Sequence, residues 1–391
     1  MTTNFDITII GAGVIGLAVG VSLAKLGKQV LILESGETIG HETSSRNSGV
    51  IHAGIYYKKN SLKARTCLRG KELLYAYLKK HKISHKKLGK YIIANMEESE
   101  KLESLLDKGL ANGVTDLKLF NKAELANKIP HANADLGIHS PSSGILDVPG
   151  YMQSLLGELR DHGGDLAVLS KFTSARKINE NSQGWEVNVG LGSDKTADKQ
   201  TISIKTNFVI NAAGLYAEEV AKKIDPMPEH LIPSTHFTKG NYFLVRGSCP
   251  FKNLIYPLPE KGGLGIHLTL DLGGQMLLGP DVEPIPISIV EKNFMRNKPE
   301  FNYTVEEKRK SAFYESVKKW WPGLKQDQLQ SAYSGIRPKL NKIAEAPADF
   351  ILQVPSDNNV PGLYNFFGIE SPGITSSLAI AEIITDDIKH S

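Results

Sequence analysis

The sequence predicts an α/β fold with two domains, one built on a strand–helix–strand unit and the other on an antiparallel sheet. Residues 6–10 form a β-branched run, residues 14–26 have helical apolar spacing, and residues 30–33 form a second strand. Short strand patterns crowd residues 236–278, which favours the antiparallel sheet. No low-complexity linker divides the 391 residues into halves, so later segments must complete the first unit.

Three glycines separate the first strand from the first helix. Gly11 permits the tight turn, Gly13 lets backbone amides approach a pyrophosphate, and Gly16 lets the helix and strand pack closely. Glu34 ends the second strand, where a carboxylate accepts hydrogen bonds from an adenosine ribose and repels a 2′-phosphate. The pattern therefore predicts a Rossmann-like dinucleotide site that disfavours NADP, and the motif alone leaves FAD and NAD open.

Composition and charge narrow the class of protein. The net charge of +4 is too small, and its charges too dispersed, to indicate a nucleic-acid-binding protein. It is compatible with a small anionic substrate. Cys67 and Cys249 have no neighbouring cysteine, so neither a disulfide framework nor a metal site is indicated. Only five residues precede the first strand and no apolar run is long enough for a membrane span. We expect a cytoplasmic protein.

Two charged or aromatic clusters have a membrane alternative. Six lysines between residues 79 and 90 suit either a solvated helix end or peripheral contact with an anionic inner membrane, and we prefer the helix end. They are Lys79, Lys80, Lys82, Lys86, Lys87 and Lys90. Trp320 and Trp321 close an amphipathic helix that begins near Val305, and core packing is the preferred role for both.

Apolar periodicity and turn residues predict the remaining elements. We expect helices at 61–81, 97–112, 148–161 and 374–388. We expect strands at 91–94, 166–169, 185–189, 208–210, 241–245, 264–270, 275–278, 329–335, 350–353 and 363–367.

Two longer motifs carry a resemblance to a known family. Residues 43–57 read TSSRNSGVIHAGIYY and residues 368–381 read GIESPGITSSLAIA. Shorter matches are NAAG at 211–214, GIHLT at 265–269 and SGIRPKL at 334–340. Over nearly its whole length the chain resembles the FAD-dependent D-amino-acid-oxidase-like superfamily and, within it, the L-2-hydroxyglutarate dehydrogenase/oxidase family.

The resemblance implies a discontinuous FAD-binding domain around an inserted substrate domain whose antiparallel sheet covers the flavin. We expect the FAD-binding domain to comprise residues 1–88, 145–232 and 328–391, and the substrate domain residues 89–144 and 233–327.

Two polar segments are expected to complete a non-covalent FAD site. The loop after Glu34 offers hydroxyl and amide donors, and a second glycine-flanked turn enters the last helix, whose N-terminus suits a reduced flavin. Gly373 has an alternative role as an ordinary helix start. The candidate cofactor-binding residues are Gly11, Gly13, Gly16, Glu34, Thr43, Ser44, Ser45, Asn47, Ser48, Gly49, Ala213, Gly214, Gly335, Gly368, Ile369, Glu370, Gly373, Ile374 and Thr375.

Oxidation of an α-hydroxy acid needs a cation for the carboxylate and a base for the hydroxyl proton. Arg337, at a strand end before Pro338, is the candidate cation, with a surface salt bridge as its alternative role. His267 is the candidate base, although a lone strand histidine is more often structural. His52 is the competing base and could instead contact, orient or covalently hold the flavin.

A dicarboxylate substrate also needs a partner for its second carboxylate. Lys239, Tyr242 and Tyr256 offer donors from the strand-rich region, with sheet stabilisation as the alternative role of each. The expected reaction is oxidation of L-2-hydroxyglutarate to 2-oxoglutarate, with electrons passed to a quinone-type acceptor or oxygen. The alternatives are an amine or amino-acid oxidase, a glycerol-3-phosphate dehydrogenase, and a flavin-binding protein without catalysis.

Overall fold

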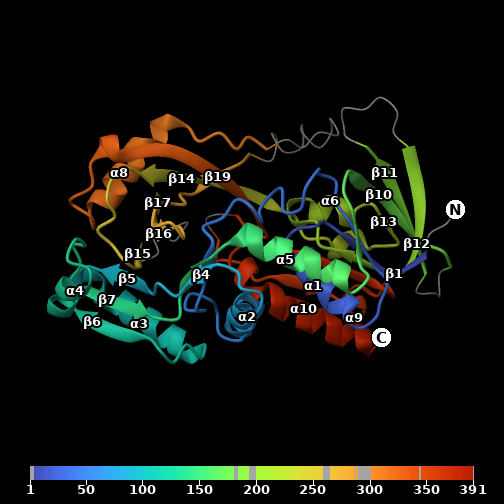
Figure 1. The fold of residues 1–391 in the computed structure, drawn as a ribbon, viewed down its shortest axis with the longest axis horizontal. Coiled ribbons are helices and arrows are strands. Elements are labelled where there is room, and N and C mark those ends of the chain that lie inside the picture. The colour runs from blue at the N-terminus through green and yellow to red at the C-terminus, as the bar shows by residue number, and fades with distance from the viewer. Residues whose placement is uncertain are drawn as a thin grey trace.

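The computed structural model describes residues 4–179, 184–192, 200–258, 265–286, 288, 301–342 and 345–390. Two nine-stranded sheets lie toward opposite ends of the long axis, and both ends of the chain lie near the first sheet (Figure 1). This arrangement confirms the predicted fold class, with a parallel nucleotide-binding core and a largely antiparallel second sheet.

The first sheet has the order β13-β10-β11-β12-β1-β2-β9, with β21 beside β12 and β20 beside β21. Strands β1, β2, β9, β12 and β21 are parallel where they pair, and β10 and β11 form an antiparallel extension. The strands are β1 (Asn4–Ile10), β2 (Val30–Leu33), β9 (Asp165–Ala167), β10 (Ser170–Lys177), β11 (Trp185–Leu191), β12 (Gln200–Asn211), β13 (Ile224–Asp225), β20 (Ile351–Gln353) and β21 (Leu363–Phe367).

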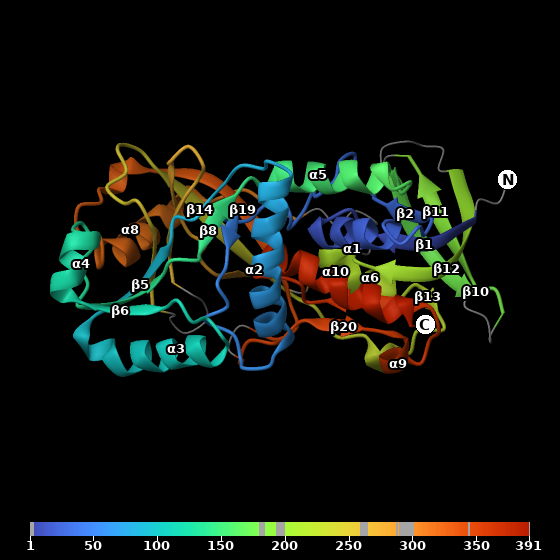
Figure 2. The ribbon, with the colours of Figure 1, turned by 60° about the horizontal axis from the view of Figure 1, so that its bottom comes forward.

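Four helices build the core against this sheet: α1 (Val14–Ala24), α2 (Leu62–Lys80), α5 (Val148–Asp161) and α10 (Gly373–Lys389). Helix α1 contacts both α5 and α10, and α10 also contacts α2 (Figure 2). Because neighbours cover α1 on nearly every side, ten of its eleven residues are buried. The last helix thus closes the core that the first strand begins.

The second sheet has the order β18-β14-β17-β16-β15-β5-β7-β6, with β19 beside β14. Its strands are β5 (Lys90–Ala94), β6 (Lys118–Asn121), β7 (Leu136–Ser140), β14 (His236–Val245), β15 (Leu254–Pro257), β16 (Leu268–Leu270), β17 (Met276–Leu278), β18 (Glu283–Pro284) and β19 (Leu329–Lys339). Helices α3 (Ser99–Ala111), α4 (Lys122–Lys128) and α8 (Lys310–Lys318) flank it (Figure 1). Trp320 and Trp321 follow α8 and are buried in its core, which confirms the core-packing prediction.

The remaining elements are short. A small antiparallel sheet joins β3 (Val50–Ile51), β8 (Gly144–Leu146) and β4 (His85–Lys86). Helices α6 (Ala217–Ala221) and α9 (Pro355–Asn358) and five 3-10 turns complete the described elements. The turns are Met96–Glu98, Gly214–Tyr216, Glu229–Leu231, Glu307–Arg309 and Gln326–Gln328.

Several expectations need correction. Strand β19 pairs with β14, so residues 329–339 join the second sheet, whereas the predicted boundary at 328 assigns them to the FAD-binding domain. The helix predicted from Val305 begins at Lys310 as α8, after a 3-10 turn. Leu264, the first residue of one predicted strand, lies outside the described residues. Lys90 is buried in β5 between β15 and β7, so it does not belong to the solvated lysine cluster.

Candidate active site

A cavity of about 1400 Å³ lies where the two sheets meet. It exceeds the roughly 300–1,000 Å³ of common small-molecule sites, so it has room for a dinucleotide together with a small substrate. Its walls come from the glycine turn after β1, the loop at 40–49, strands β14 and β19, and the N-terminus of α10. These segments are distant in sequence, so they come together only when the chain folds.

The glycine turn forms one end of the cavity. Gly11 has a φ of +105°, and a side-chain carbon there would lie 2.6 Å from the carbonyl oxygen of Ala212. A side-chain carbon on Gly16 would lie 2.0 Å from the carbonyl oxygen of Gly11, which explains the close packing of α1 on β1. Gly16 itself therefore supports the turn from behind and does not line the cavity.

The Glu34 carboxylate fixes the same turn. One oxygen accepts a hydrogen bond from the Ala12 amide at 3.0 Å and the other accepts one from the Gly36 amide at 2.8 Å. Each Glu34 oxygen retains acceptor capacity, and the side chain lines the cavity. Glu34 therefore stands where an adenosine ribose would present its hydroxyls.

The polar loop at 43–49 is held by its own side chains. The Ser44 hydroxyl accepts a hydrogen bond from the Val14 amide at 3.0 Å, in the first turn of α1. Asn47 donates to the Ser44 carbonyl at 2.7 Å and accepts from the Gly49 amide at 2.8 Å. Thr43, Ser44, Asn47, Ser48 and Gly49 all line the cavity. Ser45 is exposed, donates to the carbonyls of His41 and Glu42, and does not line it.

The N-terminus of α10 borders the opposite wall. Gly373, Ile374 and Thr375 line the cavity, as do Ala213, Gly214, Gly335, Ile369 and Glu370. The Thr375 hydroxyl accepts a hydrogen bond from the His52 amide at 3.0 Å, so this helix end is tied to the 43–57 motif. Gly368 has a φ of +68° and packs against Leu340, away from the cavity.

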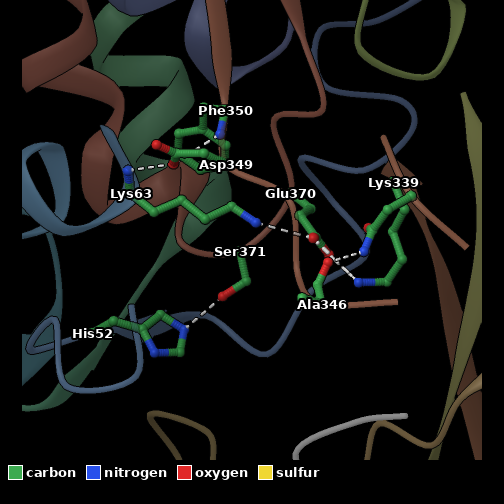
Figure 3. Close-up of polar contacts among 9 residues, drawn as sticks. His52, Lys63, Lys339, Ala346, Asp349, Phe350, Glu370 and Ser371 are labelled. Carbon is green, nitrogen blue, oxygen red and sulfur yellow. Dashed lines mark hydrogen bonds and ion pairs between the residues drawn. The ribbon is translucent and has the colours of Figure 1, made fainter. Parts of the chain in front are cut away.

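A buried ion-pair cluster stands beside this helix end (Figure 3). The Glu370 carboxylate lies 3.1 Å from the Lys63 ammonium and 3.2 Å from the Lys339 ammonium. Burial alone raises the pKa of Glu370, but Lys63, Lys339 and Arg337 outweigh it and bring that pKa below its ordinary value. Glu370 is thus an anion that holds two cations at the cavity wall.

Arg337 and Tyr242 lie together on the second sheet. Burial raises the pKa of the Tyr242 hydroxyl, while the neighbouring Arg337 guanidinium opposes that rise. Tyr242 also bonds the Ser48 hydroxyl at 2.9 Å and stacks on Tyr333 with ring centroids 4.6 Å apart. Both Arg337 and Tyr242 line the cavity, so a cation and a phenol face any substrate there.

His267 lies on the same cavity wall as Arg337 and Tyr242, one residue before β16. Its side chain is 4 % exposed and lines the cavity, and its ring stacks on Tyr256 at a centroid distance of 3.6 Å. Tyr256 lines the cavity too. The structure therefore brings His267, Arg337, Tyr242 and Tyr256 to one cavity wall.

His52 reaches the cavity from the first domain. Its Nε2 lies 3.2 Å from the Ser371 hydroxyl (Figure 3), and its buried Nδ1 has no hydrogen-bond partner in the described part of the chain. Burial, assisted by the charge of Lys90, lowers the pKa of His52 to about 3. The imidazole is therefore neutral at physiological pH.

Lys239 is not brought to the cavity. Its ammonium donates to the Thr304 carbonyl at 2.6 Å. Gly240 and Tyr242 line the cavity, whereas Lys239, three residues before Tyr242, points to the other face of β14. This position does not support the predicted role of Lys239 with the substrate's second carboxylate.

Arg46 lines the cavity and was missed in the sequence. Its guanidinium carbon lies 3.9 Å from the ring centroid of Tyr303, and its buried Nε has no hydrogen-bond partner within the described segments. Its carbonyl oxygen would lie 2.0 Å from a side-chain carbon on Gly335, so only glycine fits there. An arginine inside the polar 43–49 loop was the available signal, since it adds a cation to an anion-binding loop.

Comparison with known proteins identifies the family of this chain. A family model described as FAD dependent oxidoreductase matches residues 6–387. The L-2-hydroxyglutarate dehydrogenase of Arabidopsis thaliana is 39 % identical over 402 residues, which cover 97 % of this chain and 83 % of that protein. The chain belongs to the L-2-hydroxyglutarate dehydrogenase family of FAD-dependent oxidoreductases.

Other family members match with lower identity. The enzyme of Dictyostelium discoideum is 31 % identical, with 98 % of this chain and 92 % of that protein covered. The human enzyme is 28 % identical, with 100 % and 89 % covered. All three relatives carry names that describe them as mitochondrial.

Solved structures support the fold of this family member. L-alpha-glycerophosphate oxidase from Mycoplasma pneumoniae, with FAD bound, matches with a TM-score of 0.82 at 23 % identity and covers 97 % of this chain and 94 % of that one. Glycine oxidase from Geobacillus kaustophilus matches with a TM-score of 0.77 at 19 % identity and covers 100 % and 96 %.

The side chains of this FAD-dependent oxidoreductase fit its cofactor. The glycine turn and Glu34 suit an adenosine diphosphate, and the α10 N-terminus offers a positive dipole end on the far wall. Arg46 Nε and His52 Nδ1 belong to cavity-lining residues, are buried, and have no hydrogen-bond partner among the described residues. Both positions could therefore serve a bound group. Among the described helices, none has the length and apolarity to cross a membrane.

Proposed function

We propose that this enzyme oxidises L-2-hydroxyglutarate to 2-oxoglutarate. The observation that carries the proposal is the cavity wall on which Arg337, Tyr242 and His267 meet, in a chain whose relatives carry that activity in their names. A hydroxy acid needs both a carboxylate clamp and a proton acceptor, and this wall offers both.

Arg337 is the proposed clamp for the carboxylate next to the hydroxyl. Its guanidinium presents a planar set of donors that matches a carboxylate in a bidentate fork. The neighbouring Tyr242 hydroxyl, already bonded to Ser48, would orient the same group. This pair fixes the substrate carbon against the cofactor end of the cavity.

His267 is the proposed base. A general base must accept the hydroxyl proton near neutral pH. The pKa of His52 is lowered to about 3, so its imidazole is a poor proton acceptor. His267 would take the hydroxyl proton at a ring nitrogen, while its stack on Tyr256 holds the ring in place. When bound, FAD supplies the two-electron acceptor for the hydride of the substrate carbon. His52 would orient ligands through Nδ1.

The electron acceptor belongs to the same proposal. We propose that the reduced enzyme passes its electrons to a quinone-type acceptor or to oxygen. We also propose that the enzyme is cytoplasmic and makes peripheral contact with the inner membrane. Five exposed lysines, two at the end of α2 and three in the segment after it, support such a contact, since an anionic lipid surface attracts clustered basic residues. They are Lys79, Lys80, Lys82, Lys86 and Lys87. Sedimentation with anionic vesicles at low and high salt tests this contact.

Anaerobic reduction of the bound flavin tests the substrate. L-2-Hydroxyglutarate should bleach the long-wavelength flavin absorbance at least about 100-fold faster than its D enantiomer, glycine, sarcosine or glycerol 3-phosphate. Faster bleaching by an amine or by glycerol 3-phosphate would replace the proposal with an amine oxidase or a glycerophosphate dehydrogenase. Absence of bleaching by every compound would favour a flavin-binding protein without catalysis.

Two substitutions test the clamp. Arg337→Met should lower kcat/KM for L-2-hydroxyglutarate by about 10³-fold, and Arg337→Lys should restore only part because it loses the fork. Arg246→Met is the matched control, because Arg246 is exposed and bonds Gln330 on the same sheet. Equal activity of the Arg337 and Arg246 variants would remove Arg337 from the site.

A further inference from the structure

Lys90 is a buried cation with no anionic partner among the described residues. It is the first residue of β5 and its side chain is 1 % exposed. Its ammonium lies 4.7 Å from the ring centroids of both Tyr56 and Tyr256. In the described part of the chain, the structure gives it these two cation–π contacts and neither a hydrogen bond nor an ion pair.

The groups around Lys90 do not neutralise it. Burial raises the pKa of the Cys67 thiol to about 12, so the thiol is uncharged. Burial and Lys90 together keep His52 neutral, and burial raises the pKa of Tyr56 and Tyr256 as well. A buried ammonium without an anion tends to lose its proton, and an anion that enters from outside the chain would pair it and keep it charged.

The substrate cavity adjoins this cation. Tyr56, Tyr256 and His52 all line the cavity, and Lys90 stands directly behind the two tyrosine rings. The Tyr56 hydroxyl and His52 Nδ1 are buried and have no hydrogen-bond partner among the residues that the structure describes. Three polar groups with unused capacity therefore gather at one place on the cavity wall.

Two cavity-lining tyrosines, Tyr242 and Tyr256, form a row from Arg337 to this place. Arg337 neighbours Tyr242, and the Tyr256 ring lies against the Lys90 ammonium. The four side chains come from β19, β14, β15 and β5, which belong to one sheet. Lys90 pairs with Leu254 in the register of β5 and β15, so Lys90 and Tyr256 lie on the same face. The wall thus carries one cation at each end of the row.

We propose that Tyr56 and Lys90 form the subsite for the second carboxylate of a dicarboxylate substrate, at the opposite end of the row from Arg337. The Tyr56 hydroxyl donates to the carboxylate, and the Lys90 ammonium behind the ring supplies the opposite charge. The assignment of Arg337 to the first carboxylate rests on the proposed function. The ligand class is an aliphatic dicarboxylate, and its length of five carbons is taken from the substrate of the proposed function.

This subsite makes the second carboxylate a determinant of specificity. A dicarboxylate pairs the buried Lys90 charge, whereas a monocarboxylate of the same length leaves that charge and the Tyr56 hydroxyl unpaired. Removal of one partner from a buried charge pair weakens binding by about 30-fold or more. The enzyme should therefore bind glutarate at least about 30-fold more tightly than valerate, which has the same carbon number.

Ligand binding to the FAD-loaded enzyme tests the subsite without turnover. Glutarate and valerate are titrated while the flavin absorbance is followed. Lys90→Met should weaken glutarate binding by about 30-fold or more and change valerate binding by less than about threefold. Lys80→Met makes the same change at an exposed lysine on α2 and should leave both ligands unaffected. Tyr56→Phe removes one hydroxyl and should weaken glutarate alone by about tenfold.

Each result decides the proposal. Unchanged glutarate binding in Lys90→Met, or equal weakening of both ligands, overturns the subsite. If Lys90→Met loses FAD, Tyr56→Phe decides, and unchanged glutarate binding in that variant overturns it. Failure of the proposed function would give a different result. The flavin of the wild-type enzyme would not be reduced by L-2-hydroxyglutarate, while glutarate binding would still depend on Lys90.

Discussion

The imidazole ring of His267 lies face to face with the phenol ring of Tyr256, with centroids 3.6 Å apart and planes inclined by 12°. Tyr256 is itself 2 % exposed and belongs to β15, so it offers a rigid platform. The stack fixes the plane of the imidazole, and the direction of its nitrogens follows from that plane.

Loss of the platform should slow chemistry more than binding. Tyr256→Leu frees the His267 ring, and a displacement of about 1 Å at a catalytic group costs about 100-fold in rate. Tyr256→Phe keeps the ring and should retain the rate within about threefold. Stopped-flow measurement of flavin reduction at saturating L-2-hydroxyglutarate checks both. Equal rates in the two variants would show that the stack does not position His267.

His52 should make the enzyme sensitive to acid. Its pKa in the folded chain is about 3, below the unfolded value of 6.5, so between these values the unfolded chain binds a proton that the folded chain does not. Stability is therefore lost as pH falls below about 6.5, with a slope approaching 1.4 kcal/mol per pH unit from this residue.

Thermal unfolding of the enzyme at pH values from 7 to 4.5 measures that slope. His52→Gln should flatten the fall in stability on the acid side. His162→Gln changes an exposed histidine at the end of α5 and serves as the control. A fall that is as steep in His52→Gln as in the wild type would mean that other groups cause it.

Glu370 should be costly to neutralise. Glu370→Gln leaves Lys63 and Lys339 without their shared anion, and breaking a buried pair costs about 3–5 kcal/mol. Chemical unfolding and FAD content measure the effect. Glu382→Gln breaks the exposed pair with Arg69 and should change stability little. Similar losses of stability in Glu370→Gln and Glu382→Gln would mean that burial does not strengthen the Glu370 ion pairs.

Gly335 should tolerate no side chain. A carbon added there would lie 2.0 Å from the carbonyl oxygen of Arg46, so Gly335→Ala must push the second sheet away from the 43–49 loop. We expect FAD content below about a tenth of wild type, since close-packed interiors do not absorb such overlaps. Gly190→Ala in β11 meets nothing closer than 3.6 Å and should retain FAD. The ratio of flavin to protein absorbance checks both.

Binding of dicarboxylates should weaken with rising pH. Burial lowers the pKa of Lys90 to about 7, and only the charged ammonium attracts a carboxylate. Glutarate affinity should therefore be full below pH 7 and fall by up to tenfold per pH unit above it. The groups facing Lys90 are His52, Cys67, Tyr56 and Tyr256, which stay neutral in this range. Flavin-monitored titrations at pH 6 to 9 measure the fall, and a flat profile would contradict it.

Local patterns predicted the first sheet better than the second. Strands β2 and β21 and helix α5 begin and end at the predicted residues, because each is a buried apolar run or an amphipathic helix between clear turn residues. Nine described strands have no counterpart among the predicted ones: β3, β4, β6, β7, β8, β10, β13, β15 and β18. The partners that pair with β7 and β15 are supplied by distant segments such as β5, and local spacing carries no record of them.

The errors at the site have physical causes. Lys90 is hidden among exposed lysines in the sequence, yet pairing of β5 on both sides buries it. Lys239 and Tyr242 are three residues apart on one strand, and alternation of side chains should have excluded one of them from the cavity. The resemblance to the family, rather than periodicity, carried the choice of FAD and of Arg337.

The contact of α10 with α1 and α2 has a consequence for biosynthesis. The first strand and first helix emerge early from the ribosome, but the helix that closes their core is made from residues 373–389. Until those residues emerge, the nascent first domain lacks one wall of its core and the helix N-terminus that borders its cofactor site. Flavin uptake therefore has to wait for residues 373–389, and truncation of the chain before residue 373 should yield colourless protein.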